Sequence, residues 1–359
     1  MTIKNFLIEY DSINSSNTFT NGDVINGRII VENSKEVKIQ SLVFIAKGKA
    51  RVSWHEHHGH HGQHQNHRKS HYWADEKYYE VKHHILREAR QDGTEIIGPG
   101  RHVFPFTFRI PDKRIPSSFK SPIGKIVHKL TAELHQSMKL TKTAKVHFDF
   151  VSKADMDIPN LLDPQYGCKD KNFKVFGSGS VSLDVYTNKM GYRQGETLQV
   201  TAEIKNNASR SVKPKFELYE KISFFAQGRR RLSTNKILKE KAEAVEASSG
   251  SKTVTKTITI PRELPASILN CSIIKREYRL KVILDIKYAQ DPEIKLPIIV
   301  LPKISGEKQP TANAGFESFG GANYPAWSNT PQQAAHAFVD PPPPYGAYPM
   351  YPSRPDYKS

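Results

Sequence analysis

The chain has 359 residues, of which 37% are hydrophobic, and a formal net charge of +17 at pH 7. One hydrophobic core usually stops growing at roughly 250–300 residues, so the length argues against a single domain and for two folded units with appendages. The only cysteines, Cys168 and Cys271, lie far apart in the sequence, which argues against a disulfide framework or a thiolate metal site and favours a reducing compartment.

No targeting or membrane-spanning segment stands out in the sequence. Residues 1–10 lack the sustained apolar stretch of a signal peptide. The longest apolar run, 296–301, is far shorter than the ~20 residues that cross a bilayer. We therefore expect a soluble, cytoplasmic protein.

The positive charge is unevenly distributed along the chain. From residue 303 onward, four basic residues balance four acidic ones, so the whole excess lies in residues 1–302. Such a surface attracts anions, including nucleic acid, acidic lipid headgroups and phosphorylated peptides. A basic surface that is simply solvated is the alternative, and charge alone does not choose among these.

Short β-rich runs with period-two alternation recur between Gly, Asn, Pro and Lys turns up to residue 302, which predicts an all-β fold. The segment 240–247 (EKAEAVEA) is the main exception, because its composition is compatible with a helix. The predicted strands cover residues 24–31, 41–54, 103–110, 181–186, 198–204, 254–260 and 278–286.

The chain repeats itself once. The segment F-T-N-G-D-V-I-N-G-R-I-I-V-E-N at 19–33 aligns with Y-R-Q-G-E-T-L-Q-V-T-A-E-I-K-N at 192–206. Each repeat is later followed by a strand that ends in a proline corner, F-x-I-P then I-P-S-S-F at 108–119, and I-x-I-P then L-P-A-S-I at 258–268. The same signals in the same order predict a duplicated β-sandwich. The aligned residues are Gly22 with Gly195, Asp23 with Glu196, Ile25 with Leu198, Val31 with Ile204 and Asn33 with Asn206.

The predicted organisation has four parts. An N-terminal β-sandwich spans 1–152 and carries a histidine-rich insertion at 55–71, a linker spans 153–176, and a C-terminal β-sandwich spans 177–302. Residues 303–359 hold ten of the 23 prolines and no periodic apolar pattern, which predicts a disordered tail.

These features resemble the arrestin fold, and within it the α-arrestins, or arrestin domain-containing proteins. Beyond the repeats, G-K-A-R-V-S-W at 48–54 and S-I-L-N-C-S-I-I-K-R-E-Y at 267–278 are similar to segments of the two family lobes, and the tail carries a P-P-x-Y motif. The likeness is greatest to the group around arrestin domain-containing protein 3. It implies two immunoglobulin-like, seven-stranded sandwiches whose concave faces are directed toward a membrane cargo protein. Family members commonly carry two P-P-x-Y motifs, whereas this chain has one.

The P-P-x-Y motif is the sharpest functional signal, formed by Pro342, Pro343, Pro344 and Tyr345. Consecutive prolines preset a polyproline II helix, which loses little entropy when it docks on the aromatic groove of a WW domain. The Tyr345 ring then fills a pocket. A proline-rich linker that binds nothing is the alternative. The family resemblance implies HECT-type ubiquitin ligases with WW domains as partners, receptors or transporters as cargo, endocytosis and trafficking as the process, and a peripheral location at the plasma membrane and endosomes.

A dense group of histidines predicts a second, weaker candidate site. Several imidazoles at this spacing can meet one zinc, copper or nickel ion, but the surrounding Gly, Gln and Asn residues also fit a flexible loop that holds no metal. The histidines are His55, His57, His58, His60, His61, His64, His67 and His71.

Three consecutive arginines, Arg229, Arg230 and Arg231, precede Leu232 and Ser233. They are candidates for contact with anionic lipid, and Ser233 is a candidate phosphorylation site for a basophilic kinase. A solvated triplet is the ordinary alternative.

The sequence carries none of the nucleotide-binding or nucleophile motifs that mark common enzymes, so we expect no catalysis and no cofactor. The preferred interpretation is a cytosolic adaptor between membrane cargo and a ubiquitin ligase. Two alternatives from other classes remain: a metal-binding protein governed by the histidines, and a basic scaffold for anionic lipid or phosphopeptides without ligase recruitment. Nucleic acid is not expected, because no recognisable module accompanies the charge.

Overall fold

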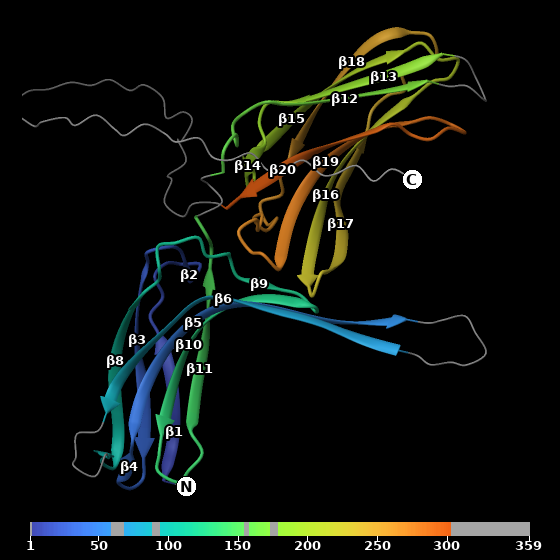
Figure 1. The fold of residues 1–359 in the computed structure, drawn as a ribbon. Coiled ribbons are helices and arrows are strands. Elements are labelled where there is room, and N and C mark those ends of the chain that lie inside the picture. Colours follow the sequence, from blue (N-terminus) through green and yellow to red (C-terminus); the bar gives the residue numbers. More distant parts are fainter. Residues whose placement is uncertain (1, 59–67, 88–93, 154–157, 173–178, 303–359) are drawn as a thin grey trace, which may run out of the picture. The chain divides into compact units, whose positions relative to one another are not determined.

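A computed structural model describes residues 2–58, 68–87, 94–153, 158–172 and 179–302 (Figure 1). The described residues form strands and connections, with no helix among them. The N-terminal strands are β1 (Ile3–Tyr10), β2 (Thr18–Phe19), β3 (Val24–Asn33), β4 (Val37–Ile39), β5 (Ser41–His58), β6 (Arg68–Arg87), β7 (Glu95–Ile97), β8 (Gly100–Arg109), β9 (Phe119–Lys120), β10 (Gly124–His135) and β11 (Lys142–Phe150). The C-terminal strands are β12 (Gln165–Asn172), β13 (Ser180–Thr187), β14 (Gly191–Arg193), β15 (Thr197–Asn206), β16 (Lys213–Ala226), β17 (Arg229–Lys241), β18 (Gly250–Thr259), β19 (Ile274–Asp285) and β20 (Glu293–Leu301).

Each half of the chain pairs a smaller sheet with a larger one. In the N-terminal lobe, the sheet β1-β3-β8 accompanies the sheet β2-β11-β10-β5-β6, and β9 adds to β10. In the C-terminal lobe, β12-β13-β15-β18 accompanies β14-β20-β19-β16-β17. The predicted all-β fold with two sheet-built lobes is confirmed.

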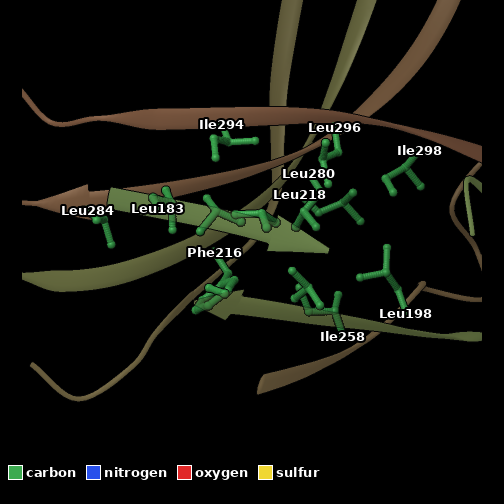
Figure 2. Close-up of a cluster of buried hydrophobic side chains, with 14 of the residues drawn as sticks. Leu183, Leu198, Phe216, Leu218, Ile258, Leu280, Leu284, Ile294, Leu296 and Ile298 are labelled. Atoms are coloured by element: carbon green, nitrogen blue, oxygen red, sulfur yellow. The ribbon is translucent and has the colours of Figure 1, made fainter. Parts of the chain in front are cut away.

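Each lobe has its own core of alternate strand residues. In the C-terminal lobe, Leu183 and Leu198 of one sheet pack with Phe216, Leu218 and Leu280 of the other (Figure 2). A separate cluster fills the N-terminal lobe, with Phe44 stacked on Phe106 at a ring-centroid distance of 4.4 Å. Burial of this apolar surface from both sheets is the main force that holds each sandwich together.

Each of the seven segments predicted to form strands lies in an observed strand, apart from a terminal residue or two. The helix-compatible segment 240–247 is extended instead. The reason is tertiary pairing: Val245 is buried, and its N–H and C=O both bond to Val212, at 2.8 and 2.9 Å. The weak helix propensity of this segment is overridden by such a tertiary contact. Within the segment predicted as a linker, 153–176, residues 165–172 form β12 and pair with β13.

The duplicated corner predicted from sequence adopts the same geometry twice. Gly22 and Gly195 have positive φ values of 80° and 82°, a conformation that glycine tolerates best. The acid that follows each glycine accepts a hydrogen bond from a backbone N–H three residues before it, Thr20 to Asp23 at 2.8 Å and Arg193 to Glu196 at 2.7 Å. Each carboxylate therefore fixes the turn that begins a long strand.

The backbone of the same acidic residue ties this turn to the proline corner. The N–H of Ile110 donates to the carbonyl of Asp23 at 2.9 Å, and the N–H of Ile260 donates to that of Glu196 at 2.8 Å. Ile110 and Ile260 both have fully buried side chains directly before a proline. Turn and corner are thus joined in the same way in both lobes.

A serine completes each corner, half-buried at Ser118 and fully buried at Ser267. The hydroxyl of Ser118 accepts from the N–H of Phe150, and that of Ser267 accepts from the N–H of Val300, both at 3.0 Å. The N–H of each serine in turn donates to the carbonyl of the same strand residue, at 2.8 Å in both lobes. This two-way bond joins the chain after the proline corner to β11 in one lobe and β20 in the other.

His128 of β10 is a buried histidine of the N-terminal core that bonds through both ring nitrogens. Its Nε2 lies 3.1 Å from the carbonyl of Pro116, which can only accept, so Nε2 carries the proton and Nδ1 accepts from the Tyr79 hydroxyl at 3.1 Å. Gly48 is necessary beside them, because a Cβ there would lie 2.4 Å from the Tyr79 ring. Burial lowers the pKa of His128 to about 4, against the opposing effect of the Pro116 bond.

We expect His128 to make stability depend on pH between about 6.5 and 4. In that range the unfolded histidine binds a proton and the folded one does not, so the free energy of unfolding falls as the pH is lowered. Urea unfolding at pH 7 and pH 4.5 should show a loss that is about 2–3 kcal/mol larger in the wild type than in His128→Gln. Parallel losses in the two proteins would contradict this.

Candidate functional site

The predicted WW-binding residues, Pro342 to Tyr345, lie outside the described residues, as do His60, His61, His64 and His67. The side chains of His57 and His58, at the end of β5, also lie outside them. The ligase-docking motif and most of the histidine group therefore stay predictions. The described part of the chain offers the remaining candidates, on the β5–β6 hairpin, on β17 and where the two lobes meet.

Two of the predicted histidines face each other on the paired strands β5 and β6. His55 and His71 are directly opposed, with ring centroids 4.4 Å apart and ring planes 18° from parallel. The Nε2 of His71 lies 2.8 Å from the hydroxyl of Ser53. Among the described residues, no group of three or more His, Cys, Asp or Glu side chains is placed to hold a metal ion. Metal binding stays a prediction, for which zinc titration against an all-Gln variant of the loop is the test.

The arginine triplet starts β17 directly after a tight turn at Gln227 and Gly228, both with positive φ. All three arginines are exposed on the strand, as is Ser233. Arg230 is held in place, because its Nε and Nη2 donate to the Ser223 hydroxyl at 3.2 and 2.9 Å. Lipid contact and phosphorylation stay predictions; vesicle association of a triple alanine variant tests the first.

A cationic cluster that sequence reasoning missed lies on the larger sheet of the C-terminal lobe. Lys236, Lys239 and Lys281 surround Glu217, at N–O distances of 3.5, 3.0 and 3.1 Å. Burial acts to raise the pKa of Glu217, but the lysine hydrogen bonds and charges outweigh it and lower that pKa to about 2. This carboxylate keeps its charge at neutral pH and neutralises part of the cluster from within.

Glu76 of β6 binds the segment that precedes β19. Its Oε2 accepts from the backbone N–H of Ser272 at 2.9 Å and from the Ser272 hydroxyl at 2.7 Å. The Tyr78 hydroxyl donates to the Cys271 sulfur at 3.1 Å. An apolar cluster adjoins these bonds, in which residues of both lobes are buried together: Ala50, Val52, Trp54, Phe119 and Ile126 with Phe224, Ala226, Ile268, Cys271 and Ile274.

No motif in the sequence marks these contacts, since Glu76 and Ser272 lie 196 residues apart.

The same contacts determine the reactivity of the Cys271 thiol. Burial raises the pKa of its thiol, against the opposing effect of the Tyr78 hydrogen bond. A thiol that resists ionisation is a weak nucleophile, so the contact fits a structural role for Cys271 better than a reactive one.

Two family models match this chain, one to each lobe. The N-terminal domain of arrestin (or S-antigen) matches residues 6–157, and the C-terminal domain matches residues 177–304. The chain belongs to the arrestin family. Within it, the relatives are α-arrestins. Arrestin domain-containing protein 4 of Homo sapiens is 26% identical over 284 residues, which cover 79% of this chain and 68% of the relative. Thioredoxin-interacting protein of Homo sapiens is 23% identical over 312 residues, which cover 85% and 75%.

A closer placement beside arrestin domain-containing protein 3 stays a prediction. The comparisons support membership among the α-arrestins, as a distant relative of the two proteins named above. Among the described residues of this arrestin, no helix could serve to cross a membrane.

We expect Glu76→Ala to loosen the segment that precedes β19. The variant removes the acceptor of the Ser272 N–H and hydroxyl, and a lost bond to a charged group costs about 1.5–3 kcal/mol. Hydrogen exchange of the Ser272 amide should therefore speed up by roughly tenfold or more. Glu36→Ala, which removes an exposed carboxylate of the same lobe, is the matched control. Unchanged protection of Ser272 would show that Glu76 does not hold it.

Proposed function

We propose that this α-arrestin is a non-enzymatic adaptor that links a membrane receptor or transporter to a HECT-type ubiquitin ligase with WW domains. The observation that carries the proposal is the P-P-x-Y motif at Pro342 to Tyr345, on a chain whose residues 6–157 and 177–304 match the two arrestin domains. The lobes bind cargo and the segment after them binds the ligase. Ubiquitination then directs the cargo to endocytosis and trafficking, at the plasma membrane and endosomes.

The physical basis of ligase binding is pre-organisation. Four consecutive prolines at 341–344 favour the polyproline II conformation before binding, so the ligase does not have to order the segment. Tyr345 supplies the aromatic anchor that fixes the direction of the peptide in the groove. Because the chain has one such motif, we expect ordinary affinity for a single WW domain rather than the avidity of a paired motif.

Tethering explains why an adaptor without catalytic residues can promote a reaction. Cargo and ligase held on one chain meet at the effective concentration that the connecting segment sets, which for short flexible linkers is in the millimolar range. Residues 302–341, about 40 in number, separate the second lobe's last strand from the motif, ample length for a ligase to reach lysines of the bound cargo. Ubiquitin transfer to cargo thereby becomes effectively intramolecular.

Replacement of Tyr345 tests the proposal. Tyr345→Ala should abolish the capture of isolated WW domains, because the anchor ring is lost, and should leave the melting temperature unchanged. Tyr348→Ala, three residues further on and outside the motif, is the matched control and should bind as the wild type does. If Tyr345→Ala retains WW binding, the ligase docks elsewhere on the chain and the assignment of this motif is wrong.

A further inference from the structure

The outer face of the N-terminal lobe's larger sheet contains a groove with an apolar floor. In β5, even-numbered residues such as Leu42, Phe44 and Ala46 point into the core, so odd-numbered residues point outward. Val43 and Ile45 are outward residues, yet they are only 6% and 8% exposed and belong to none of the apolar core clusters. They lie at the bottom of a groove of about 520 Å³.

The rim of this groove carries two cations, Lys82 and Arg87, two histidines and one carboxylate. Lys82, His84 and Arg87 of β6 line one side, and His135 and Glu133 of β10 line the other. Glu133 is the one carboxylate of the lining, and its Oε2 lies 3.4 Å from the Nε2 of His135. The groove therefore combines an apolar base with two cations, Lys82 and Arg87, on its β6 wall, which suits an apolar side chain flanked by negative charges.

Directly beside the groove, lysines face one another across three strands. Lys129 of β10 lies opposite Lys47 of β5, Lys49 is the next outward residue on β5, and Lys145 of β11 lies opposite Thr131, the next outward residue after Lys129. Lys47 pairs with Glu80 at 3.1 Å. Lys49, Lys129 and Lys145 form no ion pair with any residue that the structure describes. We call Lys47, Lys49, Lys129 and Lys145 the lysine cluster.

Like charges directly opposite in a sheet destabilise it, and the lysine cluster shows this cost. The pKa of Lys129 is lowered, first by burial and then by the charges of Lys145, Lys49 and Lys47, with Glu133 opposing. Glu217 forms ion pairs with three lysines on the other lobe, whereas no described carboxylate forms an ion pair with Lys49, Lys129 or Lys145, so an ion pair does not relieve their repulsion. A bound anion would supply that relief.

The other carboxylates on this face do not reverse its sign. Asp75 is engaged by Arg51 at 2.7 Å, and Glu80 is shared by Lys47 and Lys77, at 3.1 Å each. Asp149 and Glu133 are the remaining acids among the outward residues of the four strands. Against these four carboxylates stand ten Lys or Arg side chains: Lys47, Lys49, Arg51, Lys69, Lys77, Lys82, Arg87, Lys125, Lys129 and Lys145.

We propose that this face binds an acidic peptide segment of the cargo, with one apolar side chain in the groove over Val43 and Ile45 and carboxylates on the lysine cluster. The occupant is a peptide because a recessed apolar floor is reached by a single side chain and not by a flat bilayer surface. The proposal rests on the proposed function only in taking cargo as the source of the peptide.

Strand geometry sets the spacing that the peptide needs. Outward residues of β5 follow one another at about 7 Å, so the lysine cluster begins about 7 Å from Ile45 and extends to about 14 Å. An extended peptide advances ~3.4 Å per residue, which places its acidic residues two to four positions from the apolar one. A site of this kind selects a peptide by its negative charge and one apolar side chain. The other positions of the peptide are not selected.

Fluorescence anisotropy with the full chain tests the proposal. The probe is a labelled peptide with one leucine between two runs of four glutamates; one control peptide carries Gln for every Glu, and another carries Ala for Leu. We expect Lys129→Gln/Lys145→Gln to weaken binding of the probe about tenfold. The control variant Lys205→Gln/Lys252→Gln removes the same charge from β15 and β18 of the other lobe. It should change the affinity for the probe less than twofold.

A second variant tests the role of the groove. Val43→Thr/Ile45→Thr keeps strand-forming residues but makes the floor polar, and it should erase the preference for the leucine peptide over the alanine peptide. Unchanged thermal melting of each variant shows that the fold is retained. A variant that melts early is replaced by the single changes Lys145→Gln and Val43→Thr, with the same expected directions.

Three outcomes would overturn the proposal. Equal losses in the two lysine pairs would mean that only the general positive field attracts the probe. Equal binding of the leucine and alanine peptides by the wild type would show that the groove takes no part in peptide binding. Binding to phosphatidylserine vesicles without binding to the peptide would assign the face to membrane. Tyr345→Ala, which removes WW binding under the proposed function, should leave the affinity for the probe unchanged, so failure of one idea is distinguishable from failure of the other.

Discussion

The corner at which each sandwich is closed is the constraint on which the rest of the structure depends. In both lobes a left-handed glycine turns the chain, the next acid accepts a backbone N–H through its carboxylate, and its carbonyl accepts the N–H before the proline corner. The glycine turn and the residue before the proline corner are thus both hydrogen-bonded to a single residue, Asp23 in one lobe and Glu196 in the other. A hydrogen bond to a charged group contributes about 1.5–3 kcal/mol, a large part of a domain's net stability.

With the sandwiches closed and filled, the described part of the chain can act mainly through its surfaces. Two cationic surfaces illustrate the difference that one carboxylate makes. Around Glu217 the lysines are neutralised by a side chain of the same lobe, which holds them in place. Around Lys129, none of Lys49, Lys129 and Lys145 forms an ion pair with a carboxylate that the structure describes, and burial followed by the charges of Lys145, Lys49 and Lys47 lowers the pKa of Lys129, with Glu133 opposing. The second surface is therefore the better candidate for recognition, although both add to the same net charge.

The predicted strands and the repeat could be read from the sequence because their causes are local. Period-two alternation follows from the pleat, and Gly22 and Gly195 mark turns that few other residues tolerate. The extended path of 240–247 could not be read, since it depends on the bond between Val245 and Val212 rather than on the residues of the segment. Glu76 and Ser272, and the lysines around Glu217, come together only through the register of distant strands, for which no alternation or motif gives a signal.

The functional predictions divide in the same way. Pro342 to Tyr345 could be proposed as a docking peptide because proline presets its own backbone, whatever the rest of the chain does. Charge excess could be read from composition, but its division into a neutralised and an unneutralised cluster needed the cross-strand pairing of Lys129 with Lys47. Contact residues on the folded lobes are set by tertiary structure, so for the lobes the sequence alone named only the arginine triplet with Ser233 and the histidines.

Residue-resolved hydrogen exchange of the full chain, compared between Asp23→Asn and Glu196→Gln, tests the corner most directly. Each change keeps the size of the side chain and removes the charge that accepts the Thr20 or Arg193 N–H. The account predicts faster exchange at Thr20 and Ile110 in the first variant and at Arg193 and Ile260 in the second, with the other lobe unaffected. Wild-type protection at these amides in both variants would contradict it.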